Sequence, residues 1–266
     1  MTEQPTAVTE HPTGEAAPGV AASARDLIKV YGKGEAEVRA LDGVSVDLMK
    51  GEFTAIMGPS GSGKSTLMHC LAALDTPTSG EAVVDGTSLA RLKDKDLTTL
   101  RRERVGFVFQ SFNLVPTLTA EENILLPLSL AGRKRDRQWF DQVVDAVGLR
   151  PRLGHRPSEM SGGQQQRVAC ARALVSQPSI VFADEPTGNL DSTSSAEVLG
   201  FLRRSVDEFG QTVVMVTHDP IAASYTDRVL FLADGVIVDE LRTPDRDRIL
   251  ARMARLQDIA ATKAAQ

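Results

Sequence analysis

The chain has 266 residues, of which 42% are hydrophobic and 24% charged, and its formal net charge is −5 at pH 7. These values are typical of a globular protein with one large α/β domain and a smaller insert. The acidic balance gives no electrostatic case for a nucleic-acid partner. No apolar run approaches the roughly 20 residues that span a bilayer, and the start lacks a signal peptide's basic and apolar regions. We therefore expect a protein that is neither membrane-spanning nor secreted.

Residues 1–22 are rich in Pro, Gly, Thr, Glu and Ala and hold little apolar surface to bury. Such a composition does not offset the entropy of ordering, so we expect a disordered leader there. The main domain is then expected over 23–240, with a charged helix or tail over 241–266. The two cysteines, Cys70 and Cys170, lie in apolar helical patterns far apart. Buried, reduced thiols are expected, which suits the cytoplasm.

Short β-type runs separated by glycines follow the leader, at residues 27–31, 44–48, 53–57 and 82–84. Lys50-Gly51 between two of them is a hairpin signal. The runs predict an antiparallel subsheet beside a nucleotide-binding core. Tyr31 ends the first run, where it could stack on a planar base with Val38 covering the edge, although core packing is the other interpretation.

A glycine-rich loop joins the apolar run 53–57 to an apolar helical pattern over 65–74. Glycines let backbone N–H groups approach a polyphosphate, the lysine neutralises the β- and γ-phosphates, and the following hydroxyl ligates Mg²⁺. The pattern predicts a phosphate-binding loop rather than a flexible surface loop. Its residues are Gly58, Pro59, Ser60, Gly61, Ser62, Gly63, Lys64 and Ser65, followed by Thr66.

The next segments read as a charged helix over 91–104 and a buried strand over 105–109 that ends at Gln110. From 111 to about 160 the pattern is helical, with a capping box at Thr119 and Glu122. We expect a helical insert between two strands of the sheet. The basic run 133–137 is either a solvated helix face or a surface near lipid headgroups or a membrane partner.

A second candidate for a phosphate-facing helix start follows the insert. Ser161 is a natural N-cap of a helix that continues to about Val175, and two glycines at its start would expose N–H groups to an anion. A simple cap with a flexible entry is the alternative. The residues concerned are Ser161, Gly162, Gly163 and Gln164.

Polar residues end the two remaining core strands. The apolar run 179–183 leads into Asp184 and Glu185, which suit a metal ligand and a general base respectively. After a turn at 188–191, with Ser192 as the expected helix cap, the strand 212–217 ends at His218. Because ligands bind beyond the carboxyl ends of parallel strands, we expect these side chains near the same crevice. Asp234-Gly235 predicts a closing hairpin.

The ordered set of motifs resembles the ATP-binding subunit of ABC transporters over about residues 24–240. The resemblance rests on Tyr31, the glycine-rich loop, Gln110, the 160–164 signature, the 184–185 strand end, Asp191 and His218. Met160 stands where the family usually has leucine, a change between apolar residues of similar volume. The segments 110–123 and 186–191 resemble more particularly the branch of ABC transporters that releases lipoproteins or exports macrolides.

The resemblance implies an α/β fold with a P-loop NTPase core, mainly a parallel sheet with flanking helices. It also implies an N-terminal antiparallel β-subdomain and a helical insert carrying the ABC signature. Two copies would close head to tail over two ATP and Mg²⁺, on the cytoplasmic face of a membrane permease. Its implied roles are adenine stacking for Tyr31, sensing of Mg²⁺ and water for Gln110, signature contacts for Ser161 and Gly163, catalytic base for Glu185, subunit communication for Asp191 and γ-phosphate switching for His218. The metal set is Ser65, Gln110 and Asp184.

Several other functions share parts of this pattern. An ATPase of the same superfamily in DNA repair, chromosome organisation or translation usually has a long coiled-coil insert or a second copy of the motifs, and this chain shows neither. A small-molecule kinase has no use for the signature. An ATPase that drives an envelope or cell-division complex mechanically, without transport, would have the same motor.

Overall fold

A computed structural model describes residues 19–264 of the chain. Most of the expected disordered leader, residues 1–18, lies outside the described residues. The prediction is wrong for Val20 to Ala22, which form the start of the first strand and are buried. Two neighbouring strands pair with this segment, and that pairing supplies the burial that its composition did not reveal.

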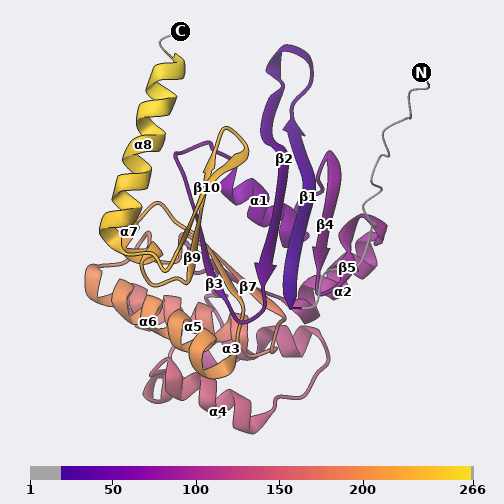
Figure 1. The fold of residues 1–266 in the computed structure, drawn as a ribbon. Helices are drawn as coiled ribbons and strands as arrows, with labels where there is room; N and C mark the ends of the chain where they lie inside the picture. Colours follow the sequence, from indigo (N-terminus) through magenta and orange to yellow (C-terminus); the bar gives the residue numbers. More distant parts are fainter. Residues whose placement is uncertain (1–18, 265–266) are drawn as a thin grey trace, which may run out of the picture.

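The strands form two sheets (Figure 1). A four-stranded antiparallel sheet has the order β2-β1-β4-β5, and a six-stranded sheet has the order β10-β9-β3-β8-β7-β6. In the second sheet β9, β3, β8, β7 and β6 run parallel, and β10 is an antiparallel edge strand. The strands are β1 (Val20–Tyr31), β2 (Val38–Met49), β3 (Phe53–Met57), β4 (Ser79–Val84), β5 (Thr87–Ser88), β6 (Val105–Phe109), β7 (Ile180–Asp184), β8 (Val213–Val216), β9 (Arg228–Ala233) and β10 (Val236–Arg242).

Helices cover the parallel sheet on both faces. Helix α1 lies between the two sheets, and α3 to α6 lie on the opposite side (Figure 1). The helices are α1 (Lys64–Leu71), α2 (Asp94–Arg104), α3 (Ala120–Leu130), α4 (Arg137–Ala146), α5 (Gly162–Leu174), α6 (Ser192–Phe209), α7 (Pro220–Ala223) and α8 (Arg246–Ala264). Short 3₁₀ turns are η1 (Gly34–Ala36), η2 (Leu89–Arg91), η3 (Arg150–Arg152) and η4 (Pro157–Glu159). None of the described helices combines the length and apolarity needed to cross a membrane.

Alternation along the central strands divides the core in two. In β8, Val213 and Met215 pack with α3 to α6, whereas Val214 and Val216 pack with α1 and the antiparallel sheet. Successive side chains of a strand point to opposite faces, so a strand covered on both sides is apolar throughout. The predicted P-loop NTPase architecture, with its antiparallel subsheet and helical insert, is therefore confirmed.

The two cysteines belong to this core. Cys70 and Cys170 are both buried and free, as predicted. Burial raises the pKa of each thiol to about 12. Both are therefore protonated, inert packing groups at neutral pH.

Local turn and cap predictions had mixed outcomes. Asp234 and Gly235 join β9 to its antiparallel partner β10, as expected, and both have positive φ. Lys50-Gly51 does not close a hairpin, because β2 and β3 belong to different sheets. The N-cap of α6 is Asp191, not Ser192, and the C-terminal helix begins at Arg246 because residues 241 and 242 still belong to β10.

The segment between β6 and β7 holds α3 and α4 and leads into α5. Thr119 caps α3 in a full capping box with Glu122, as predicted. Fully buried Asn123 exchanges hydrogen bonds with the Val115 backbone, so the loop before α3 is fixed to the helix. Within the basic run, Arg135 pairs with Glu121 at 2.6 Å, and all five residues 133–137 are exposed.

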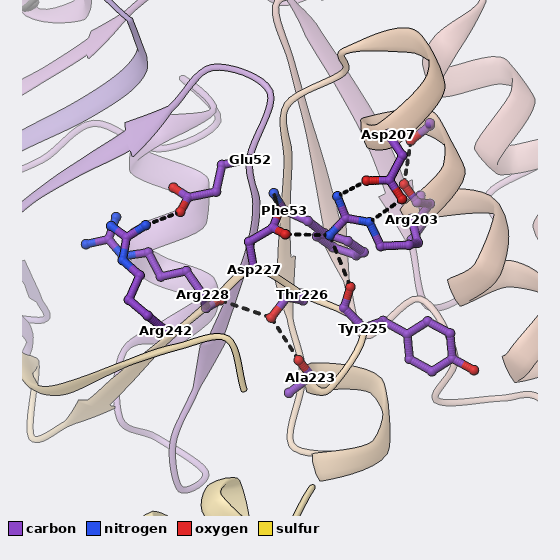
Figure 2. A network of polar contacts seen from close by, with 12 residues as sticks. Glu52, Phe53, Arg203, Asp207, Ala223, Tyr225, Thr226, Asp227, Arg228 and Arg242 are labelled. Carbon is purple, nitrogen blue, oxygen red and sulfur yellow. Dashed lines mark hydrogen bonds and ion pairs between the residues drawn. The ribbon is translucent and has the colours of Figure 1, made fainter. Parts of the chain in front are cut away.

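A polar network fastens the start of β3, the strand that leads into the glycine-rich loop (Figure 2). The Asp227 carboxylate accepts the Phe53 N–H at 2.8 Å and the Arg203 guanidinium at 2.9 Å. Arg203 also donates to Asp207 at 2.7 Å and lies over the Phe53 ring. The network joins the start of β3 to α6 and to the segment before β9, at the end of the strand opposite the loop.

Candidate functional site

The glycine-rich loop turns between the end of β3 and the start of α1. A Cβ at Gly58 would lie 2.0 Å from the Leu232 carbonyl oxygen, and one at Gly63 would lie 2.2 Å from that of Ala40. Both residues also have positive φ, at 155° and 99°. Only glycine fits such close approach and such backbone angles. The loop thus presents backbone N–H groups at the N-terminus of α1, where an anion is favoured.

Lys64 begins α1 with its ammonium folded back over the loop. Its Nζ donates to the Pro59 carbonyl oxygen at 2.8 Å. Burial lowers the pKa of Lys64, while the nearby carboxylates of Glu185 and Asp184 raise it. The Lys64 ammonium therefore interacts electrostatically with both the predicted metal ligand Asp184 and the predicted base Glu185, although these acids come from a distant part of the sequence.

Ser65 and Asp184 approach each other at the end of β7. The Ser65 hydroxyl donates to Asp184 Oδ1 at 3.4 Å. Burial raises the pKa of Asp184, the neighbouring Glu185 carboxylate adds to the shift, and His69 opposes it. A half-buried carboxylate destabilised in this way favours a bound cation. In the described part of the chain no three His, Cys, Asp or Glu residues cluster as metal ligands. One carboxylate plus a hydroxyl fits Mg²⁺, which usually completes its shell with phosphate oxygens and water.

Glu185 follows β7 with an unusual backbone angle, φ of 46°. Its N–H donates to the Val216 carbonyl oxygen at 2.9 Å, and its Oε1 lies 2.9 Å from His218 Nδ1. Because of this left-handed backbone conformation, Glu185 does not continue the regular strand geometry. The two consecutive acids therefore contact different residues: Asp184 faces Ser65, and Glu185 faces His218. Both side chains line an open pocket of about 370 Å³ together with Leu190, Ser192 and Ile221. A carboxylate held by a histidine at a solvent-accessible pocket can accept a proton from water.

Gln110 directly follows β6, and its side-chain amide is held by Asn189, which the sequence analysis did not single out. Gln110 Nε2 donates to Asn189 Oδ1 at 3.3 Å, and Asn189 Nδ2 donates back to the Gln110 carbonyl oxygen at 3.2 Å. A Cβ at Gly188 would lie only 2.8 Å from Gln110 Nε2. The turn after Glu185 is therefore built around Gln110. The one sequence feature that could have indicated Asn189 is its place within residues 186–191, a segment that resembles ABC transporters.

Ser161 caps α5 as predicted and forms a capping box with Gln164. The side-chain hydrogen bonds described for both residues stay within this cap. A Cβ at Gly163 would lie 2.5 Å from Ser194 Oγ, so this glycine lets α5 approach the start of α6. Ser194 in turn donates to the Asp191 carboxylate from its N–H and its hydroxyl. Ser194 thus links the 161–164 segment to Asp191. None of these contacts involves the glycine-rich loop.

Two further buried side chains of α5, Gln166 and Arg172, donate hydrogen bonds to the backbone at or just after the ends of β6 and β7. Gln166 donates to the carbonyl oxygens of Phe109 and Pro186 at 3.1 and 2.6 Å. Arg172 donates to those of Phe112 and Asn113 at 2.8 and 2.5 Å, where both residues have positive φ. The sequence analysis did not predict the roles of these two residues. A polar residue within a mostly apolar helix does not indicate which other segment its side chain contacts.

Tyr31 ends β1 opposite Val38 of β2. The two side chains are exposed, at 41% and 62%. The Tyr31 hydroxyl donates to Asp75 Oδ2 at 2.6 Å. An exposed aromatic ring held at its hydroxyl end is not core packing, and its free surface is available to a planar group.

Comparisons with known proteins agree with this geometry. A family profile described as "ABC transporter" matches residues 41–188. The chain is 45% identical to the bacitracin export ATP-binding protein BceA of Halalkalibacterium halodurans, over 85% of this chain and 90% of that protein. It is 47% identical to the macrolide export ATP-binding/permease protein MacB of Syntrophobacter fumaroxidans, over 81% of this chain but only 31% of that protein. The chain therefore spans about a third of the length of such macrolide export relatives.

Solved structures give the same result. The fold is similar to a dimeric post-hydrolysis state of the ATP-binding cassette MJ0796 bound to ADP and Pi. The TM-score is 0.76 and the identity 41%, over 84% of this chain and 99% of that one. It is also similar to cbiO1 of Clostridium perfringens, with a TM-score of 0.76 and 26% identity over 88% and 91% of the two chains.

Proposed function

This chain belongs to the ABC transporter family as an ATP-binding subunit that hydrolyses ATP, and from this premise we propose that two copies close head to tail over two ATP molecules to drive a separate membrane permease. The observation that carries the proposal is the presence of two phosphate-type helix starts in one chain. The first, at Lys64 and Ser65, lies beside the end of β7, where the Ser65 hydroxyl is 3.4 Å from Asp184 Oδ1. The second, at Ser161, is built with α6. A partner's copy of the second would complete the first.

The side chains around the start of α1 supply the chemistry of hydrolysis. Lys64 moves its ammonium from the Pro59 carbonyl to the β- and γ-phosphates, where it neutralises charge. Ser65, Asp184 and Gln110 would hold Mg²⁺, which when bound neutralises charge on the phosphate oxygens. Glu185 accepts a proton from the attacking water, and His218 holds the carboxylate and then the γ-phosphate. The partner's Ser161 hydroxyl and Gly163 N–H would donate to the transition state, because the Ser161 N–H is already held by Gln164.

A groove lined by residues of α2, β6 and α3 is the surface that we assign to the permease. It has a volume of about 530 Å³ and is lined by Phe107, Leu126, Leu130 and Arg101 among others. Leu130, whose side chain is 68% exposed, gives the groove an apolar wall together with Phe107 and Leu126. A permease segment in this groove would contact the helical insert and place the chain on the cytoplasmic face of the membrane. The named relatives, a bacitracin export protein and a macrolide export protein, favour export. The resemblance at 110–123 and 186–191 adds a substrate of the macrolide or lipoprotein type to the proposal.

Mixing two inactive variants tests the head-to-tail dimer. Lys64→Ala removes the phosphate cation, and Gly163→Asp clashes with Ser194 and adds a negative charge to the signature. A mixed dimer keeps one intact site, so a 1:1 mixture should recover up to roughly a quarter of wild-type hydrolysis. Released phosphate is the measurement. As the control, Lys64→Ala mixed with the doubly substituted chain should recover nothing. If the first mixture is also inactive, the composite site is wrong.

Co-purification tests the partner. The Glu185→Gln chain, which should stay closed on ATP, is expressed in its native host and purified from detergent-solubilised membranes. We expect an integral membrane protein in the complex, and fewer such complexes when Leu130→Glu is added to the groove. Recovery of only a soluble complex with nucleic acid would contradict the transporter assignment.

A further inference from the structure

Tyr31 is held at both its hydroxyl and its ring, by two residues that no motif contains. Its hydroxyl donates to Asp75 Oδ2 at 2.6 Å, and Lys29 Nζ donates to the other oxygen, Oδ1, at 2.5 Å. The same ammonium lies over the Tyr31 ring, 4.8 Å from its centroid. A single carboxylate therefore fixes both the edge of the ring and the cation on one of its faces.

The carboxylate itself lies in a firmly connected segment. Asp75 follows α1, and its N–H donates to the His69 carbonyl oxygen of that helix. Lys29 also donates to the Thr76 carbonyl oxygen, and Thr78 exchanges hydrogen bonds with β1 through Ile28 and Val30. Because α1 begins with Lys64 and Ser65, the same helix sets the position of the phosphate loop and of Asp75.

The charges of the cluster are matched at neutral pH. Burial and the hydrogen bond to Asp75 raise the pKa of the Tyr31 phenol, so it remains a donor. Burial alone would lower the pKa of Lys29, but Asp75 raises it above the ordinary value. The Lys29 and Asp75 side chains are only 12% and 28% exposed. A partly buried ion pair with further hydrogen bonds is better ordered than a surface pair.

We propose that Asp75, together with Lys29, is a positioning residue for the nucleotide base: it fixes the plane of the Tyr31 ring on which the base stacks. This inference rests on the proposed function, which assigns base stacking to Tyr31. With Lys29 over one face, a single face of the ring remains for the base. Because the Tyr31 ring is already ordered, less conformational entropy is lost when the base binds. Helix α1 also keeps the ring at a constant distance from the phosphate-binding loop.

The experiment separates base binding from phosphate binding. Isothermal titration with ATP and with inorganic tripolyphosphate is carried out on wild type, Asp75→Ala, Tyr31→Phe and Tyr31→Ala. Asp75→Ala and Tyr31→Phe should each weaken ATP binding roughly 3- to 10-fold, the net worth of one hydrogen bond, and leave tripolyphosphate binding unchanged. The doubly substituted Tyr31→Phe/Asp75→Ala chain should bind ATP no more weakly than Asp75→Ala alone, because both changes remove the same contact. The KM for ATP should rise while kcat is kept.

Asp85→Ala is the matched control. Asp85 also bridges two cations, Lys50 and Arg104, but at the far end of the sheets beside Ser179. Its loss should lower the melting temperature without changing ATP affinity. If Asp75→Ala keeps wild-type ATP binding while Tyr31→Ala loses affinity, the positioning role is wrong and base stacking stands. Equal losses for ATP and tripolyphosphate in Asp75→Ala would also overturn the positioning role. If Tyr31→Ala keeps wild-type ATP affinity, the stacking assignment itself fails.

Discussion

Replacing Glu185 with glutamine is expected to lower the rate of ATP hydrolysis about 10²- to 10⁴-fold, the usual contribution of a general base. The amide keeps the size of the side chain and its hydrogen bond to His218, which measures 2.9 Å in the wild-type chain. It does not accept a proton from water at neutral pH. ATP affinity should therefore be retained, and the closed ATP-bound dimer should accumulate.

Single-turnover phosphate release and ATP titration measure the two effects separately. Glu197→Gln is the matched control, because Glu197 is an exposed acid of α6 that pairs with Arg167 away from the pocket. It should hydrolyse ATP like the wild type. Wild-type hydrolysis by the Glu185→Gln chain would show that another group is the base.

Replacing Lys64 with alanine should weaken ATP binding as well as abolish hydrolysis. The ammonium is the cation at the start of α1, and its loss removes a charge-assisted contact to the phosphates. We expect ATP binding to weaken roughly 10- to 150-fold, which corresponds to about 1.5–3 kcal/mol for a hydrogen bond to a charged group. Tripolyphosphate binding should fall to the same extent, because the contact involves only phosphates.

Titration with both ligands tests this expectation. Lys50→Ala is a suitable control, since Lys50 is an exposed lysine that pairs with Asp85 remote from the loop. It should leave both affinities unchanged. Unchanged ATP binding in the Lys64→Ala chain would count against the phosphate-binding loop.

Sequence reasoning was most accurate where a structure depends on neighbouring residues. The strand, loop and helix over 53–71 were predicted from apolar alternation and glycine spacing. The caps at Thr119 and Ser161 and the hairpin at 234–235 also follow from local chemistry. These features depend on backbone angles and on hydrogen bonds across a few residues, which residue types specify directly.

Local signals failed where the partner was distant. Lys50-Gly51 carries the same turn signal as Asp234-Gly235, yet it links two different sheets. Residues 20–22 looked like part of a disordered leader, yet β2 and β4 pair with this end of β1 and bury it. Burial by a strand that is remote in sequence leaves no trace in the local composition, so residues 20–22 resemble the segment before them.

The sequence by itself determined the residue types of the site and the local geometry of each part. Motif order was enough to indicate the family, because a glycine-rich loop, a signature and an acidic strand end rarely occur together. Only the tertiary structure decided which parts meet. Glu185 reaches His218, Gln110 reaches Asn189 and Tyr31 reaches Asp75 across intervals of 33, 79 and 44 residues. Such contacts depend on strand order and on the path of α1, which arise from packing of the whole core and not from any local pattern.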